Sequence, residues 1–147
     1  MIQDRDYHFM RIAIEEAQLA YEEGEVPVGA VLTLGGELIA RDHNRTEQLC
    51  DATAHAEMLC LTAATAHLRS KYLRQAVMYI TLEPCAMCAG ALAWVQIGEI
   101  VFAASDPERG FSRYKPSPLH PKTQWRQGPF EQEALALLKR FFQERRL

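Results

Sequence analysis

The spacing of hydrophobic residues over the first quarter of the chain predicts a helix followed by a β-hairpin. Residues 4–23 read as an amphipathic helix that ends at Gly24, because apolar residues recur there at helical spacing. These are Phe9, Ile12, Ala13, Ala17 and Ala20. Residues 26–34 are β-branched and apolar, which favours a strand. Gly35-Gly36 is then a turn signal, and residues 37–42 form the return strand.

The middle of the chain alternates polar loops with short apolar segments. Residues 43–54 are polar and irregular, and Asp51 or Thr53 can cap a helix over about 55–68. A short apolar run at 77–82 suits a buried strand. Pro84 then stands where a helix can start, and residues 85–96 are apolar and helical.

The last third predicts a strand, a loop and a closing helix. Residues 100–104 form the strand, and the Pro, Ser and Arg content of residues 105–125 argues against regular structure there. Residues 130–146 form the closing helix. Its inward residues are predicted to be Leu135, Leu138, Phe141 and Phe142. Strands that alternate with helices late in the chain indicate parallel pairing. The fold class is therefore α/β, a mixed sheet with helices on both faces.

Length and composition are those of an ordinary globular protein. With 147 residues, 48% of them hydrophobic and 24% charged, residues 1–147 are expected to form a single domain. No apolar run approaches the roughly 20 residues of a membrane helix. The start, residues 1–6, is acidic and lacks the layout of a signal peptide. We therefore expect a cytoplasmic protein with no membrane partner.

Charge is distributed unevenly along the chain. Residues 1–108 carry 7 Lys/Arg and 16 Asp/Glu, whereas residues 109–147 carry 9 Lys/Arg and 3 Asp/Glu. No acidic residue lies between Arg109 and Arg126, a stretch that also contains Arg113, Lys115 and Lys122. Such asymmetry indicates an anionic partner near this end of the chain. A solvated loop and a helix end with basic caps would give the same pattern.

Four cysteines in a chain of this length do not predict a disulfide framework. Cys85 and Cys88 form a Cys-x-x-Cys motif, which in a cytosolic protein is more often metal-binding or redox-active. Cys60 is interpreted as a small buried hydrophobic residue, and no role is assigned to Cys50.

Two short motifs point to a catalytic zinc site. His55-Ala56-Glu57 and Pro84-Cys85-Ala86-Met87-Cys88 each open a predicted helix, where unpaired N–H groups and the helix dipole stabilise thiolates. Zinc accepts two such sulfurs together with an imidazole nitrogen, and three protein ligands leave a fourth position for water. Zinc lowers the pKa of that water to about 7. Glu57 lies two residues past the histidine, so it can sit beside the metal and move protons.

Each motif alone has other interpretations. A lone His-x-Glu is usually chance, and a lone Cys-x-x-Cys fits redox chemistry, structural zinc or core packing. A thioredoxin-like interpretation leaves His55 and Glu57 unexplained. Together the motifs form the H-x-E…P-C-x-x-C signature already recorded for zinc nucleobase deaminases.

The chain resembles the bacterial tRNA adenosine deaminases of the cytidine deaminase-like superfamily from about residue 7 to residue 146. The motifs that carry the resemblance are Val26-Pro27-Val28-Gly29-Ala30-Val31, His43-Asn44-Arg45, Asp51-Ala52-Thr53-Ala54-His55-Ala56-Glu57 and Thr81-Leu82-Glu83-Pro84-Cys85-Ala86-Met87-Cys88-Ala89-Gly90-Ala91. The closing Leu137-Leu138 and Phe141-Phe142 with Arg145 also match.

This resemblance implies a three-layer α/β/α sandwich with a five-stranded mixed sheet, and a homodimer. It implies Zn²⁺ on His55, Cys85 and Cys88, with Glu57 as the general acid and base. It also implies a base pocket that includes Asn44 and the backbone around Ala56. Asp106 matches an acidic position near the substrate ribose. For Asn44 and Asp106, a plain turn role is the alternative.

The departures from the family lie in the last third. Gly110-Phe111-Ser112-Arg113 and Leu119-His120 differ from the expected loop, and Trp94 looks more like the related guanine deaminases. Three hypotheses follow. The first is deamination of adenosine to inosine at the tRNA wobble position, with the stretch 109–126 meeting phosphates. The second is a deaminase of guanine or another free base or nucleoside. The third is a non-catalytic zinc module.

Overall fold

A single five-stranded sheet organises the chain. The computed structural model describes residues 2–145, and its strands lie in the order β2-β1-β3-β4-β5. The strands are β1 (Gly29–Leu34), β2 (Glu37–His43), β3 (Ala76–Leu82), β4 (Glu99–Ala104) and β5 (Gln124–Gln127). The helices are α1 (Asp4–Glu22), α2 (Ala56–Leu68), α3 (Ala86–Trp94) and α4 (Glu131–Glu144), with a short 3-10 helix, η1 (Phe111–Arg113).

The sheet is mixed, as predicted. β1 pairs antiparallel with both β2 and β3, and β3, β4 and β5 run parallel. Because the parallel strands are joined by crossovers, α3 and the 105–123 segment each lie between two strands that point the same way. The carboxyl ends of β3 and β4 therefore lie side by side at one edge of the sheet. The segments that follow these two strands both begin there.

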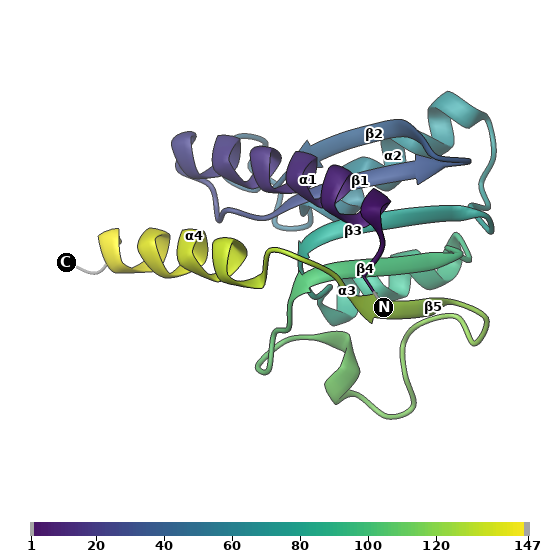
Figure 1. The fold of residues 1–147 in the computed structure, drawn as a ribbon. Helices are drawn as coiled ribbons and strands as arrows, with labels where there is room; N and C mark the ends of the chain where they lie inside the picture. The colour runs from purple at the N-terminus through teal and green to yellow at the C-terminus, as the bar shows by residue number, and fades with distance from the viewer. Residues whose placement is uncertain (1, 146–147) are drawn as a thin grey trace.

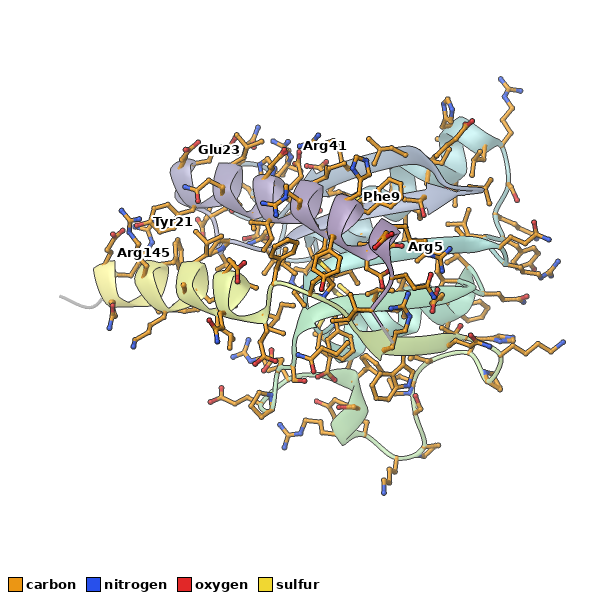
Figure 2. The ribbon with its side chains drawn as sticks, viewed as in Figure 1. Arg5, Phe9, Tyr21, Glu23, Arg41 and Arg145 are labelled. Carbon is orange, nitrogen blue, oxygen red and sulfur yellow. The ribbon has the colours of Figure 1, made fainter. Side chains whose placement is uncertain are left out.

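Helices cover both faces of the sheet, so the molecule has three layers (Figure 1). α1 and α4 lie over one face, where Phe9 and Met10 pack against Val31, Tyr79 and Val101. Figure 2 shows Phe9 turned from α1 toward the sheet, and its ring lies 5.4 Å from that of Tyr79. α2 and α3 lie over the other face, against a buried set of side chains that comprises Leu32, Met78, Ile80, Ile100, Phe102, Cys60 and Leu92. The expected α/β/α sandwich is confirmed.

A two-residue turn joins β1 to β2. Gly35 and Gly36 have φ values of +60° and +81°, and Leu34 pairs directly with Glu37 across them. A two-residue hairpin turn with positive φ at both positions favours glycine, because a Cβ atom is strained there. The predicted turn at these two residues is confirmed.

The 105–125 segment contains more regular structure than the sequence predicted. It holds η1, and the fifth strand begins at Gln124. β5 is a short edge strand with mostly exposed side chains, so it lacks the apolar run that marks a buried strand. Two contacts hold this segment in place instead. The Trp125 ring stacks on Phe102, with centroids 5.9 Å apart, and Thr123 Oγ1 donates a hydrogen bond to Ile97 O at 2.6 Å.

The predicted inward face of the closing helix is partly wrong. Phe141 is buried and faces Tyr21 of α1, which Figure 2 shows between the two helices. Leu135 and Phe142 are exposed, and Leu138 is half-buried. α4 buries Ala134 and Phe141 against α1 and the sheet, whereas Leu135, Leu138 and Phe142 line the cavity described below.

The predicted caps of α2 are also wrong. His55 occupies the N-cap position and no side chain caps the helix. Asp51 Oδ1 instead accepts hydrogen bonds from the backbone N–H and the hydroxyl of Thr53, at 2.8 and 2.7 Å. Asp51 thus orders the loop that leads into the helix, and leaves the first turn of α2 open at its N-terminus.

Candidate zinc and substrate site

Three potential metal ligands converge where α2 and α3 begin. His55 and Cys85 are the N-cap residues of the two helices, and Cys88 lies in the first turn of α3. His55 Nδ1 lies 3.4 Å from Cys88 Sγ and 3.7 Å from Cys85 Sγ. The sequence placed both motifs at helix starts, and this placement is confirmed.

The donor set fits a zinc ion. Zn–N and Zn–S bonds of about 2.0 and 2.3 Å in a tetrahedron place nitrogen and sulfur about 3.6 Å apart. The ligand atoms of His55, Cys85 and Cys88 all lie within 4.8 Å of one another. One imidazole and two sulfurs are the ligands that zinc prefers, and a three-residue set leaves one coordination position open.

The environment of the two sulfurs favours a thiolate. A hydrogen bond from Cys88, aided by His55, lowers the pKa of Cys85 to about 3 despite burial. The same hydrogen bond raises the pKa of Cys88, because Cys88 keeps the shared proton. His55 also has a raised pKa, through its hydrogen bond with Cys85. A cation bound between these groups would displace the protons that they share.

Glu57 is a buried carboxyl group two residues from His55. It is 4% exposed, and burial raises its pKa to about 7. A carboxyl group that can gain or lose its proton near neutral pH is suited to general acid–base chemistry. Cys60, one turn further along α2, is fully buried and its Sγ lies 3.3 Å from Ala30 O, as its interpretation as a core residue requires.

A cavity of about 1050 Å³ opens above these residues. This volume is at the upper end of the range for small-molecule sites, so the cavity can hold a nucleoside with room for neighbouring groups. Three elements contribute to its walls: the loop after β2, the loop after β4 and helix α4. The residues proposed from sequence that line it are Asn44, His55, Ala56, Glu57, Cys85 and Asp106.

Asn44 and Asp106 differ in how free their side chains are. Asn44 is 7% exposed and makes two long contacts of 3.4 Å, from its Nδ2 to Val26 O and from Thr46 N to its Oδ1. Asp106 Oδ1 accepts the backbone N–H groups of Glu108 and Arg109, both at 3.1 Å. Asp106 therefore forms a turn at the cavity wall, as its alternative interpretation expected.

Glu83 helps to build the site, a role that was not predicted from the sequence. This carboxyl group is 4% exposed and holds the loop after β4, since it accepts the backbone N–H groups of Asp106 at 3.1 Å and Ser112 at 2.9 Å. Phe111 N also donates to Pro84 O at 2.9 Å. The feature of the sequence that could have indicated this role is an acidic residue placed between an apolar strand and Pro84.

The basic stretch 109–126 does not form one continuous surface. Arg109 lines the cavity, whereas Lys122 lies beside Gly98, where β4 begins at the opposite edge of the sheet. Arg126 pairs with Asp6 at 2.7 Å and with Glu99 at 2.9 Å, so it stabilises the fold. Trp94 is 84% exposed and is absent from the residues that line the cavity. Trp94 therefore lies outside the cavity of its own chain.

Comparison with known proteins identifies the family. Residues 3–104 match the cytidine and deoxycytidylate deaminase zinc-binding region. The chain belongs to this deaminase family. It is a hydrolytic enzyme with a zinc cofactor, which excludes the non-catalytic zinc module. No helix among residues 2–145 has the length and apolar character needed to cross a membrane.

Relatives of this deaminase cover nearly the whole chain. A tRNA-specific adenosine deaminase from Aquifex aeolicus (strain VF5) is 42% identical over 95% of each chain. A solved structure from work on A-to-I editing by tRNA:A34 deaminases at the wobble position is 40% identical, with a TM-score of 0.84 over 90% of this chain and 99% of that chain. A guanine deaminase from Nitrosomonas europaea, 22% identical with a TM-score of 0.78 over 96% of this chain and 85% of that one, shows the shared fold alone.

Proposed function

We propose that this deaminase converts adenosine to inosine at the wobble position of tRNA, with His55, Cys85 and Cys88 as zinc ligands and Glu57 as the catalytic acid and base. The observation that carries the proposal is the meeting of three zinc-type donor atoms with a buried carboxyl group beneath one cavity. The tRNA-specific relatives at about 40% identity over most of the chain support the substrate.

Each residue has a separate task in the proposed reaction. Bound zinc is a Lewis acid that lowers the pKa of a water molecule to about 7. Glu57 takes a proton from the attacking water and delivers it to the amine that leaves C6 of adenine. Asn44 and the backbone around Ala56, at the open start of α2, orient the base by hydrogen bonds. Asp106 lies near the ribose.

The cavity wall supports a substrate larger than a free base. Leu135, Leu138 and Phe142 of α4 present apolar side chains to the cavity, on which bases next to the target can stack. Arg109 supplies a cation at the same opening. A free guanine would leave these groups without a role, and so the observations favour a polynucleotide.

The proposal extends to how the protein assembles and where in the cell it acts. We infer a single domain over residues 1–147, a homodimer and a cytoplasmic location, where tRNA is available. Exposed Trp94 and Met87 on the outer face of α3 support the homodimer, because large apolar side chains at a surface favour contact with another copy. Light scattering of the purified protein would test it, and a monomer at micromolar concentration would contradict it.

Release of ammonia tests the proposed activity directly. The zinc-loaded protein is incubated with an anticodon stem-loop RNA that has adenosine at the wobble position, and separately with guanine. We expect ammonia from the RNA only, and activity on guanine alone would overturn the tRNA substrate. Glu57→Gln should keep its zinc and lose at least about 100-fold in turnover. Glu47→Gln, at the cavity wall, is the matched control and should stay active.

A further inference from the structure

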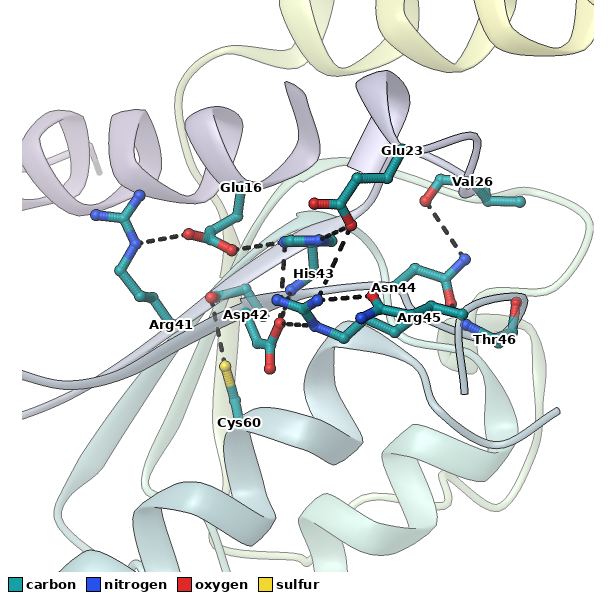
Figure 3. Close-up of polar contacts among 12 residues, drawn as sticks. Glu16, Glu23, Val26, Arg41, Asp42, His43, Asn44, Arg45, Thr46 and Cys60 are labelled. Carbon is teal, nitrogen blue, oxygen red and sulfur yellow. Dashed lines mark hydrogen bonds and ion pairs between the residues drawn. The ribbon is translucent and has the colours of Figure 1, made fainter. Parts of the chain in front are cut away.

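His43 is a buried imidazole that bridges two carboxylates, Glu16 of α1 and Glu23, the C-cap residue of that helix. It is the last residue of β2 and is 1% exposed. Its Nδ1 lies 2.8 Å from Glu16 Oε1, and its Nε2 lies 2.9 Å from Glu23 Oε1 (Figure 3). Glu16 and Glu23 are seven residues apart, two turns along the same face of the helix.

Both ring nitrogens of His43 face a carboxylate oxygen at hydrogen-bond distance. The cluster around the ring has three carboxylates, Glu16, Glu23 and Asp42, and two cations, Arg41 and Arg45. His43 therefore ties the end of β2 to two points, one within α1 and one at the C-terminus of that helix.

The same cluster has the residue types of a metal site, but arginine side chains already donate hydrogen bonds to its carboxylates. Oxygens of Glu16 and Asp42 lie within 4.8 Å of a His43 nitrogen and of each other. However, Arg41 Nε donates to Glu16 Oε2 at 2.7 Å, and Arg45 Nε donates to Asp42 Oδ1 at 2.7 Å. The guanidinium groups already provide the positive charge that a metal would bring.

The next residue along the chain is Asn44, which lines the cavity. Its backbone N–H donates to Val28 O at 3.1 Å, and its side chain has only the two 3.4 Å contacts described above. Since these contacts are long, the position of Asn44 depends on its neighbours. His43 fixes it from one side through α1, and Arg45 from the other through Asp42 (Figure 3).

The loop beyond Arg45 is anchored independently. Glu25 is 1% exposed, and its two oxygens accept the backbone N–H groups of Glu47 at 3.0 Å and Gln48 at 2.8 Å. Loss of the His43 contacts would therefore leave residues 47–48 in place and act mainly on Asn44. This separation makes the role of His43 measurable.

We propose that His43, held between Glu16 and Glu23, is a positioning residue that sets Asn44 in the base pocket. The inference rests on the proposed function, since Asn44 is proposed there to orient the base. His43 itself does not line the cavity, and it acts through the adjoining backbone.

Kinetics on the anticodon stem-loop RNA test the positioning role. His43→Gln removes the ring that contacts both Glu16 and Glu23, and Glu16→Gln removes the carboxylate that contacts both His43 and Arg41. We expect KM to rise about tenfold in each variant, with kcat within about twofold. Glu15→Gln is the matched control, because Glu15 is the neighbouring acid of α1 and is exposed. Zinc content should be unchanged in all three variants. A KM equal to that of the unsubstituted protein in both His43→Gln and Glu16→Gln would overturn the inference.

Nuclear magnetic resonance of the zinc-loaded protein gives a test that needs no activity. We expect displaced side-chain amide signals of Asn44 in His43→Gln but not in Glu15→Gln. Unmoved Asn44 signals in His43→Gln would overturn the inference even where a variant melts too early for kinetics. Failure of the unsubstituted enzyme to deaminate the RNA would instead count against the proposed function.

Discussion

Glu83 and Gly110 approach each other so closely that a Cβ atom on residue 110 would lie 2.3 Å from the Glu83 carboxyl carbon. Distances under 3.0 Å essentially never occur for a real Cβ atom. Glu83 is also the residue that holds the backbone of Asp106 and Ser112. The geometry of the loop after β4 thus depends on the absence of a side chain at residue 110.

Gly110→Ala should therefore disturb both stability and substrate binding. The added methyl group must displace Glu83 or the loop, at a cost of about 2 kcal/mol in the free energy of unfolding. KM for the stem-loop RNA should rise, because Asp106 and Arg109 move with the loop. Urea unfolding and steady-state kinetics would measure the two effects. Ser112→Ala keeps the backbone N–H that Glu83 binds and should change neither quantity, whereas an unaffected Gly110→Ala would contradict the close fit.

Removal of zinc should abolish activity and lower the melting temperature. The proposed ligands join the first turns of α2 and α3, so the metal stabilises the contact between two helices. Dialysis against a chelator should give an inactive protein that regains turnover when Zn²⁺ is added back. Cys88→Ser should retain less than about one tenth of the zinc after the same dialysis. Cys50→Ser removes a thiol at the cavity wall that is no ligand, and its zinc content should be normal.

The pair formed by Asp6 and Arg126 should contribute stability that depends on pH. Burial alone would raise the pKa of Asp6, but hydrogen bonds from Arg126 and from the Gln3 backbone lower it below the ordinary value of 3.8. A carboxyl group with a lowered pKa stabilises the fold fully above that ordinary value. Its contribution is lost as the pH falls through the pKa of the folded state.

Asp6→Asn should thus lower the free energy of unfolding by about 2 kcal/mol at pH 7. The difference from the unsubstituted protein should shrink below pH 3.8, and denaturant unfolding at a series of pH values would follow it. The metal is absent from both proteins at low pH, so its loss cancels in the difference. Asp4→Asn, an exposed acid in the same turn of α1, is the control. A difference that stays constant down to pH 2.5 would rule out the proposed linkage.

Arg109 and Lys122 should differ in their effect on RNA binding. Arg109 lines the cavity, and Arg109→Ala should weaken binding of the stem-loop RNA and reduce the salt dependence of log Kd by about 1, the value of one phosphate contact. Lys122 lies at the other edge of the sheet, so Lys122→Ala should leave both quantities unchanged. Fluorescence titration at several salt concentrations would distinguish them. Equal effects would indicate that the basic stretch acts as one surface.

The sequence predicted most of the fold because most elements bury one apolar face. Helix α1 could be placed from apolar residues at helical spacing, such as Phe9 and Ala13, and the hairpin from the apolar run 26–34 and the Gly35-Gly36 pair. β5 could not be found from its residue pattern, since an edge strand of Gln124, Trp125, Arg126 and Gln127 owes its place to partners far away in the chain. The fifth strand was expected only because the chain resembles a family with a five-stranded sheet.

The residues proposed as metal ligands could be predicted from the sequence, and the groups that support the site could not. His55, Cys85 and Cys88 stand in short motifs whose spacing reflects local helix geometry. The contacts of Glu83 join residues 23 and 29 positions apart, and those of His43 reach 20 and 27 positions back, so no local pattern reports them. Leu135 and Phe142 were assigned to the core because a helical apolar stripe looks the same whether it faces a sheet or a cavity.

The turn at Gly35-Gly36 has a practical use. It lies at the far ends of β1 and β2 from Gly29 and His43, and a Cβ atom on either glycine would meet nothing within 4 Å. A fluorophore or a short epitope inserted between these glycines would project into solvent, away from the proposed RNA-binding cavity. Such a labelled enzyme would report its encounters with tRNA while its turnover remained that of the parent protein.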